Sequence, residues 1–294
     1  MKLVQVLVLG LSLGAIYGLI ALGFVTIFKG TRVFNLAQGS VMVVGVSVTA
    51  LLTERFGFAA AAALGIAAAA LLGALLDRVI ALARRADHLV LSILTVGLDV
   101  ILVAETSRLI GTTFATVDDP WGSTTISVIG ATVPLTRVIA LVAGVALIVV
   151  FFVVFRTTRF GIRMRASAAD SETAALMGIS QRNISLSAWA IGGALAATAG
   201  IFLAMFPSPG LDANSHFLAF HAIPAVIIGG LDSSVGAIVG GLIVGVAQTA
   251  ATSYEASLGF LGSGIGDVTP YILMILFLLA RPTGIFGTKE LIRV

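Results

Sequence analysis

The side chains that could carry out metal or acid–base chemistry are few and scattered. The chain has three histidines, His88, His216 and His221, and none fits the H-E-x-x-H spacing that places two histidines on one face of a zinc-binding helix. His216 and His221 lie near the turn-rich segment "FPSPGLDANSHF", where a structural or gating role is favoured over a metal site. There are no cysteines, which excludes disulfides, thiolate metal ligands and cysteine nucleophiles. No Ser-His-Asp arrangement can be argued, so we predict no bound metal and no enzyme activity for this chain alone.

The chain also lacks a recognisable site for nucleotide phosphates. A P-loop has the spacing G-x-x-x-x-G-K-[ST], in which loop amides and the lysine hold the phosphates. The nearest string, "TGIFGTKE", has the wrong spacing and is not followed by a helix. We therefore expect no cofactor on this chain, and any ATP hydrolysis must come from another polypeptide.

Three ionisable residues interrupt the apolar segment "LSILTVGLDVILVAETSRLIG", namely Asp99, Glu105 and Arg108. An ionisable side chain inside a membrane span costs about 2.5–3.5 kcal/mol on insertion scales, so it indicates a function by default. Glu105 and Arg108 have the i,i+3 spacing of a helical ion pair, and structural pairing is the favoured interpretation. Asp99 has no local partner, so it either lines a pathway or bonds to a neighbouring helix.

The elements that must position these residues are membrane helices. Hydrophobic residues make up 59% of the 294 residues and charged residues only 11%, against about 25% charged in soluble domains. The mean hydropathy is +1.12. The net charge of +3 could suit nucleic acid, but in so apolar a chain we expect the basic residues in cytoplasmic loops that face anionic lipid. The uncharged run from Leu3 to Phe28 is longer than the apolar core of a signal peptide and predicts a retained first span.

The predicted fold is all-α, a polytopic transmembrane bundle of eight or nine hydrophobic segments forming a single domain over residues 1–294. The predicted segments cover residues 3–28, 36–53, 58–83, 89–110, 135–155, 184–206, 217–231, 235–253 and 269–281. Several are shorter than the roughly 20 residues of a straight crossing. The segment 36–53 follows the polar break "NLAQGS", and 217–231 contains Pro224. We expect one or two of these helices to be broken and to be buried in protein or to line a cavity.

The distribution of charge predicts the orientation. Five arginines lie between Arg156 and Arg182, and the tail after Arg281 is also basic, whereas the loops 111–134 and 254–268 contain acids and no Lys or Arg. By the positive-inside rule, the basic segments and the C-terminus are cytoplasmic and both acidic loops are external. The N-terminus is then external if every early segment crosses. In the external segment, "DDPWGS" is a turn signal that predicts a short hairpin or irregular cap, with a plain solvated loop as the alternative.

Small residues dominate several spans. The stretch "GAIVGGLIVGVA" places Gly236, Gly240 and Gly241 at the small-xxx-small spacing that lets helix backbones approach closely. We assign a packing role to these three and to the preceding pair, Gly229 and Gly230. Packing within the chain and packing against a partner span both fit this pattern.

The segment "RASAADSETAALMGIS" at residues 165–180 is polar yet has the signals of a short capped helix. Ser167 and Asp170 resemble a capping box, with Asp in place of Glu or Gln, and Asp170 and Glu172 place negative charge near the positive end of the helix dipole. Gly178 stands at the C′ position. A helix of about ten residues is only about 15 Å long and cannot cross the bilayer. A capped helix approached by arginines predicts a docking element on the cytoplasmic side.

This segment resembles the cytoplasmic coupling segment of ABC importer permeases, in particular the branched-chain amino acid permease family. Two further stretches, at 14–45 and 225–245, and the terminal "RPTGIFG" at 281–287 are similar to the same family, whose shorter permease subunit the chain resembles. One departure is Gln38, which stands where the family's "NFAHG" has His. The residues that match the family's coupling pattern are Gly161, Arg165, Ala166, Asp170, Glu172, Ala175, Leu176, Gly178 and Ile179.

The resemblance implies a permease subunit of an ATP-driven importer for branched-chain and hydrophobic amino acids in the bacterial cytoplasmic membrane. It implies a paralogous second permease, two ATPase subunits that bind ATP and Mg, an external solute-binding protein, and no nucleic acid. An ABC permease for urea, amides or an aromatic acid is an alternative, as is an ion-coupled secondary transporter that uses Asp99 or Glu105. A purely structural membrane partner is disfavoured by the capped helix. The pathway candidates are Asn35, Gln38, Ser40, Asp99, Glu105, Asp232 and Ser234.

Overall fold

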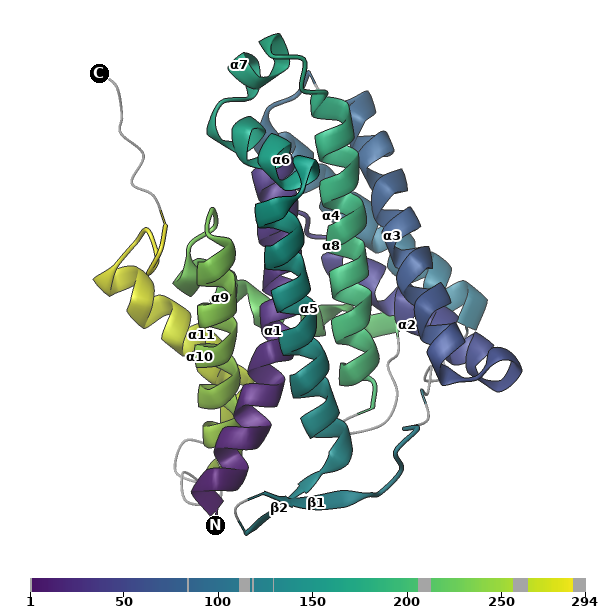
Figure 1. The fold of residues 1–294 in the computed structure, drawn as a ribbon, viewed down its shortest axis with the longest axis vertical. Coiled ribbons are helices and arrows are strands. Elements are labelled where there is room, and N and C mark those ends of the chain that lie inside the picture. The colour runs from purple at the N-terminus through teal and green to yellow at the C-terminus, as the bar shows by residue number, and fades with distance from the viewer. Residues whose placement is uncertain are drawn as a thin grey trace. The chain divides into compact units, whose positions relative to one another are not determined.

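The computed structural model describes residues 2–83, 85–110, 117, 119–128, 130–205, 213–255 and 264–287. Within these residues the chain is almost entirely helical (Figure 1). Its elements in chain order are α1 (Lys2–Thr31), α2 (Gln38–Phe56), α3 (Phe58–Leu82), α4 (His88–Ile110), β1 (Thr125–Val128), β2 (Ala131–Pro134), α5 (Leu135–Thr157), α6 (Arg159–Ala169), α7 (Ser171–Leu176), α8 (Gln181–Leu203), η1 (Ala213–Ala222), α9 (Ile223–Gly229), α10 (Ser234–Ser253) and α11 (Ile265–Ala280).

The predicted polytopic helical bundle is confirmed. Seven of the described helices are long and apolar enough to cross a membrane: α1, α2, α3, α4, α5, α8 and α10. Two shorter apolar helices cover Ser215–Gly229 and Ile265–Ala280. Each of these nine helices falls on one of the predicted hydrophobic segments. The agreement is expected because membrane insertion depends on an uninterrupted apolar run, which can be read directly from the sequence.

One predicted short span is a broken element. The segment 217–231 begins in η1, a 3-10 helix, and continues as α9, with Pro224 in its first turn. Proline fits the first turn of a helix because its missing N–H has no partner there. Gly230, with φ of 105°, ends α9 in a backbone conformation that side-chain-bearing residues rarely adopt.

The segment 111–134, predicted to be external, contains a short hairpin, which is one of the predicted alternatives, but its strands are joined at residues 129–130 and not at "DDPWGS", which precedes β1. β1 and β2 pair antiparallel, with Thr125 opposite Pro134 and Val128 opposite Ala131. Residues 111–116 and Asp118 of the same loop lie outside the described residues, as do Lys289, Glu290 and Arg293 of the basic tail.

The chain divides into two compact units, each assembled from segments distant in sequence. Unit 1 comprises residues 1–25, 121–144 and 220–294, and unit 2 comprises residues 26–120 and 145–219. The expectation of one permease domain over 1–294 stays a prediction.

Unit 1 is built around α10. Gly240 faces α9 so closely that a Cβ there would overlap the main-chain oxygen of Ala225. Gly241 meets Gly18 of α1, and Gly236 meets Gly229. The small residues of α10 therefore pack within the chain, and a residue with a side chain could not replace them without moving a neighbouring backbone.

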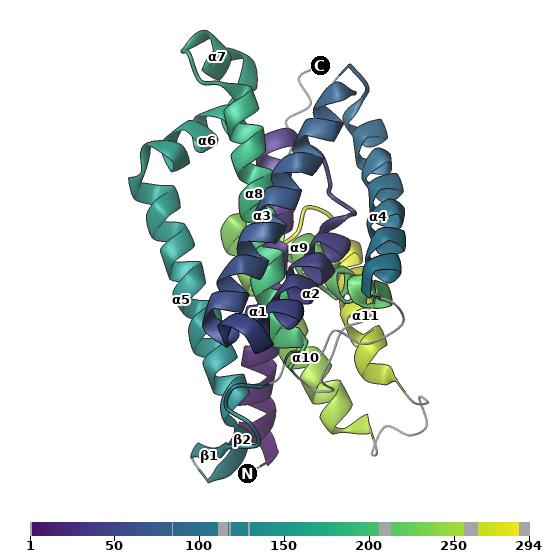
Figure 2. The same cartoon turned by 90° about the vertical axis from the view of Figure 1, so that its right-hand side faces the viewer.

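Unit 2 is built around α2, α3 and α8, which lie side by side (Figure 2). Close approach again depends on small residues, since a Cβ at Gly193 would overlap the carbonyl oxygen of Ala69 and one at Gly73 that of Trp189. A buried core of apolar side chains joins these helices to the start of α4 and contains Leu76, Ile80, Leu91 and Trp189.

Candidate functional site

The predicted coupling segment, about residues 156–183, contains two helices, α6 and α7, with a break at Asp170. Thr158 is the N-cap of α6, and its side chain accepts a hydrogen bond from the Gly161 amide. Gly161 lies against the backbone of Phe155, and Arg165 donates to the Phe155 carbonyl oxygen. Gly161 and Arg165, both matched to the family pattern, thus set the angle at which the chain leaves α5.

Asp170 is the N-cap of α7. Its backbone is extended, with φ of −154° and ψ of 104°, and its Oδ1 accepts from the amides of Glu172 at 3.0 Å and Thr173 at 3.1 Å. The Thr173 hydroxyl donates to Oδ2 at 2.6 Å. These hydrogen bonds favour the carboxylate, so they lower the pKa of Asp170, the Thr173 side-chain bond most strongly.

The prediction that Ser167 caps this helix is wrong. Ser167 lies inside α6, which continues to Ala169, and its hydroxyl donates to Gln181. A capping residue needs non-helical dihedral angles, and the chain adopts these three residues later, at Asp170. The helix that follows is consequently shorter than the predicted ten residues, covering the six residues Ser171–Leu176.

α7 ends as Gly178 predicts. Gly178 has φ of +80°, its amide donates to Ala175 O at 2.9 Å, and the Ile179 amide donates to Ala174 O at 3.0 Å. This is the Schellman arrangement, which satisfies carbonyls at a helix end. At this end Leu176 is 88% exposed and Met177 79% exposed. Figure 1 shows α7 beyond the ends of α6 and α8, and the exposed Leu176 and Met177 make its C-terminal end apolar.

Four of the pathway candidates form two separate buried hydrogen-bonded groups in unit 2. Asn35 Nδ2 donates to Gln38 Oε1 at 2.9 Å, and Gln38 Nε2 donates to the carbonyl oxygen of Gly192 in α8 at 2.9 Å. Ser40 donates to Asp99 Oδ1 in α4. The first group lies at the entry to α2 and the second joins α2 to α4, and a role in the pathway stays a prediction for all four residues.

Asp99 bonds to neighbouring elements, which is one of the two alternatives that its sequence context leaves open. Besides the Ser40 hydroxyl, Asp99 Oδ2 lies 3.6 Å from Nε2 of His216 in η1. Both side chains are buried. The other acid of α4 behaves as its spacing predicts, since Arg108 Nε donates to Glu105 Oε2 at 2.9 Å in an exposed ion pair.

The remaining candidates lie in unit 1 where α9 turns into α10. Ser233 caps α10 by accepting from the Gly236 amide at 3.0 Å, so Ser234, which is buried, is the first helical residue, and Asp232 lies in the turn. The amides of Ile285 and Phe286 donate to carbonyls at the end of α9, at 2.8 and 3.0 Å. Two family-like stretches, 225–245 and 281–287, thus meet in space.

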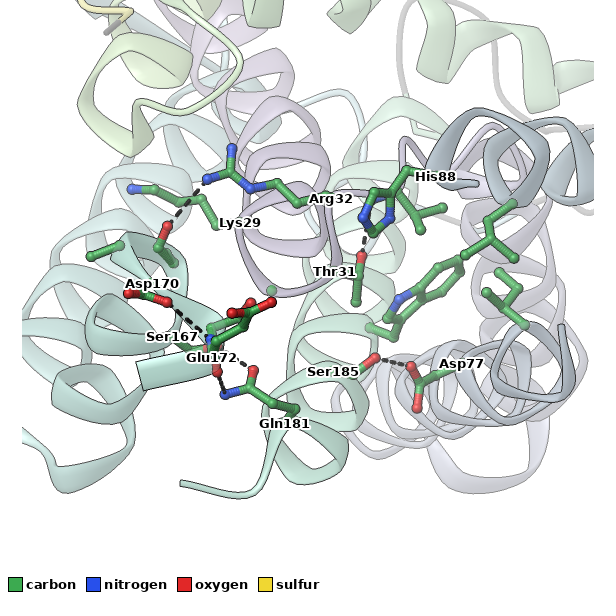
Figure 3. A pocket seen from close by; sticks show the side chains of 18 residues that line it. Lys29, Thr31, Arg32, Asp77, His88, Ser167, Asp170, Glu172, Gln181 and Ser185 are labelled. Carbon is green, nitrogen blue, oxygen red and sulfur yellow. Dashed lines mark hydrogen bonds between the residues drawn. The ribbon is translucent and has the colours of Figure 1, made fainter. Parts of the chain in front are cut away.

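A cavity of about 590 Å³ opens in unit 2 beside the coupling segment. Figure 3 shows Lys29 and Arg32 on one side of it and Asp77 with Ser185 on the other. Ser185 of α8 donates to Asp77 Oδ1 of α3. The lining residues come from the end of α1, from α3, the start of α4, the α6–α7 junction and α8: Lys29, Gly30, Thr31, Arg32, Val33, Asp77, Ile80, His88, Leu91, Ser167, Ala168, Ala169, Asp170, Ser171, Glu172, Gln181, Ser185 and Trp189.

Sequence reasoning missed this cavity. Asp77 carries a signal that could have identified it, because it is an acid inside the apolar segment that forms α3. Its partner Ser185 is 108 residues away and carries no such signal. Within the described parts of the chain, no group of three or more His, Asp or Glu side chains is placed to hold a metal ion. The cavity combines cationic and anionic side chains, so its chemistry suits a ligand that carries both charges.

The chain is similar to a described permease family and to individual permease proteins. The family model described as "Branched-chain amino acid transport system / permease component" matches residues 6–279. The high-affinity branched-chain amino acid transport system permease protein LivH of Salmonella typhimurium is 29% identical, over 97% of this chain and 96% of that protein. BraD of Pseudomonas aeruginosa, a permease protein of the same description, is 30% identical, over 99% of this chain and 97% of that protein. Among solved structures, a chain of PsaBC from Streptococcus pneumoniae in complex with Fab is 15% identical, covers 92% of this chain and 90% of its own length, and has a TM-score of 0.49.

Proposed function

Because the chain belongs to the branched-chain amino acid permease family, we propose that it is the permease subunit of an ATP-driven importer of branched-chain and other hydrophobic amino acids. It lies in the bacterial cytoplasmic membrane with its C-terminus in the cytoplasm. A paralogous permease chain supplies the other half of the translocation pathway. An external solute-binding protein delivers the amino acid, and two ATPase subunits bind on the cytoplasmic side.

The observation that carries this proposal is the geometry of α7. The helix is fixed at both ends, by the Asp170 cap and by the Gly178 turn. Its tip exposes Leu176 and Met177, on the side of the membrane where the arginines of residues 156–182 are expected. An apolar tip on a rigid, capped helix suits insertion into a groove of a soluble partner, as helix-in-groove recognition requires.

The ATPase subunits supply the nucleotide-binding site that is missing from this sequence. No P-loop is present in the sequence, so the energy of ATP must reach the spans through a contact with another subunit. ATP binding can change the access of the pathway only if the ATPase contact differs between the outward and inward states. α6 and α7 transmit this difference to the spans, because α6 continues from α5 through Gly161 and Arg165 and α7 leads through Gly178 into α8.

The test is co-purification together with transport. Native membranes that express the chain with Leu176→Asp and Met177→Asp are solubilised gently and affinity-purified, and ATP-dependent leucine uptake is measured in vesicles. We expect P-loop ATPases to co-elute with the native chain and to be lost, together with uptake, in the α7 variant.

The matched control is Phe56→Asp. Phe56 is also an exposed apolar residue at a helix end, 52% exposed, but it ends α2, on the opposite side of the membrane in the predicted topology. ATPase binding should survive this change. Retention of the ATPases by the α7 variant, or their absence from the native chain while other membrane complexes stay intact, would overturn the proposal.

A further inference from the structure

We propose that the cavity in unit 2 binds a zwitterionic amino acid, with its ammonium group at Asp77 and Ser185 and its carboxylate at Lys29 and Arg32. The solute class rests on the proposed function. The site itself is additional to a pathway shared by two permease chains, because all of its walls come from one unit of one chain. In the predicted topology it opens on the cytoplasmic side, where α1, α3 and α5 end and α8 begins.

The anionic wall is an incompletely satisfied carboxylate. Asp77 is only 2% exposed, and its Oδ1 accepts from the Ser185 hydroxyl. Its Oδ2 is covered and has no hydrogen-bond partner among the described residues. A buried carboxylate with a single neutral donor is costly, and a cationic donor relieves that cost. An ammonium group in the cavity supplies the charge and up to three donors after a small rotation of the Asp77 side chain.

A second unsatisfied group lies in the same walls. Trp189 of α8 is fully buried, and its Nε1, which can only donate, has no partner in the described part of the chain. Both atoms are covered in this structure, so a ligand that offers a donor and an acceptor reaches them only after the Asp77 carboxylate and the Trp189 indole turn toward the cavity. Arg32 donates to the Ala168 carbonyl oxygen at 3.2 Å, which holds its guanidinium at the cavity. Guanidinium and ammonium groups there are the partners that a carboxylate prefers.

The cavity is also of the right size and in a place that matters for coupling. Its volume of about 590 Å³ lies within the range of about 300–1,000 Å³ typical of small-molecule sites. Its walls include Ala168, Asp170 and Glu172 at the junction of α6 and α7. A ligand that joins these residues to α1, α3 and α8 favours one arrangement of the coupling segment. Solute accumulated inside the cell therefore changes how strongly the ATPases are coupled to the spans.

The test is equilibrium binding of L-leucine to the full chain with its co-purifying subunits, in phosphatidylcholine nanodiscs, by calorimetry. Isocaproate, which lacks the ammonium group, and isoamylamine, which lacks the carboxylate, are the comparison ligands. We expect leucine to bind, and both analogues and the Asp77→Asn variant to show affinity reduced by about tenfold or more. Trp189→Phe should weaken binding less. Glu54→Gln, which removes an exposed acid remote from the cavity walls, should bind as the native chain does.

Two results would overturn the proposal: no leucine binding by the native chain, or unchanged affinity in Asp77→Asn with an unchanged melting temperature. If ATP-dependent leucine uptake persists in either case, the proposed function stands and only the cavity site fails. Absence of uptake with ATPases bound would count against the proposed function itself. A phosphatidylethanolamine headgroup has the same ammonium and anionic chemistry. Competition with leucine in nanodiscs of that lipid, removed by Asp77→Asn, would assign the site to the lipid as its natural zwitterion.

Discussion

The Ser40 hydroxyl donates a hydrogen bond to Asp99 and so joins the buried start of α2 to the middle of α4. Fifty-nine residues separate the two in sequence. This pairing explains how an acid is accommodated inside a span, because a buried carboxylate is tolerated where a donor meets it.

Replacement of Asp99 should separate structural from transport roles. Asp99→Asn keeps an acceptor for Ser40, so stability and uptake should stay close to native. Asp99→Leu leaves Ser40 only a 3.4 Å contact with the residue-99 carbonyl oxygen, so we expect a loss of about 1–3 kcal/mol in unfolding free energy. Thermal unfolding in detergent measures the stability of each variant, and uptake in vesicles measures its transport. A native-like melt of Asp99→Asn combined with abolished uptake would instead assign Asp99 to the pathway.

The Asp170 cap predicts how coupling depends on pH. Its hydrogen bonds, above all from the Thr173 hydroxyl, lower its pKa in the folded chain. A lowered folded pKa means that the cap's contribution is fully present above the unfolded value of about 3.9 and is lost only as the pH falls through the folded pKa. ATPase association should therefore be the same at about pH 5.5 and pH 7.5. Asp170→Ala should weaken association at both values, and a loss confined to mildly acidic pH would contradict this account.

The end of α7 requires glycine for its backbone conformation alone. A Cβ at Gly178 would meet nothing within 4 Å, yet φ there is +80°. Gly178→Ala should strain the helix end by about 1–2 kcal/mol, and Gly178→Asn should be tolerated better. Reduced ATPase co-purification is the readout. Gly57 has a similar φ of +76° and equally open surroundings at the α2–α3 corner. Gly57→Ala should lower stability without affecting ATPase binding, and equal loss of binding by both would contradict a specific role for α7.

Close packing of α10 against α9 predicts a stability effect. A Cβ at Gly240 would overlap the Ala225 carbonyl oxygen, so Gly240→Ala should destabilise the chain by about 1–3 kcal/mol. Gly97 of α4 has nothing within 4 Å of the same position, and Gly97→Ala should be neutral or slightly stabilising. Melting temperatures of the two variants test the contrast. Equal melting temperatures would show that α10 can move away from α9 at little cost.

Much of the fold could be predicted from the sequence. Apolar runs predicted the seven candidate spans and the two shorter apolar helices of the described residues, since burial in lipid requires length and composition that are visible locally. Pro224 and the following glycines predicted the broken element of η1 and α9, and Gly178 the end of α7, because backbone conformation is restricted at the residue itself. The i,i+3 spacing of Glu105 and Arg108 likewise predicted a contact within one helix turn.

Tertiary structure alone decided which distant residues meet. The partner of Asp99, the Asp77–Ser185 bond and the cavity beside the coupling segment all depend on how α2, α3, α4 and α8 pack. The start of α7 was misplaced by three residues for the same reason, since Gln181 of α8 engages Ser167 and α6 continues past it. Local sequence fixes propensity, hydropathy and backbone strain, whereas a hydrogen bond between helices depends on their register, which is set by the packing of the whole bundle.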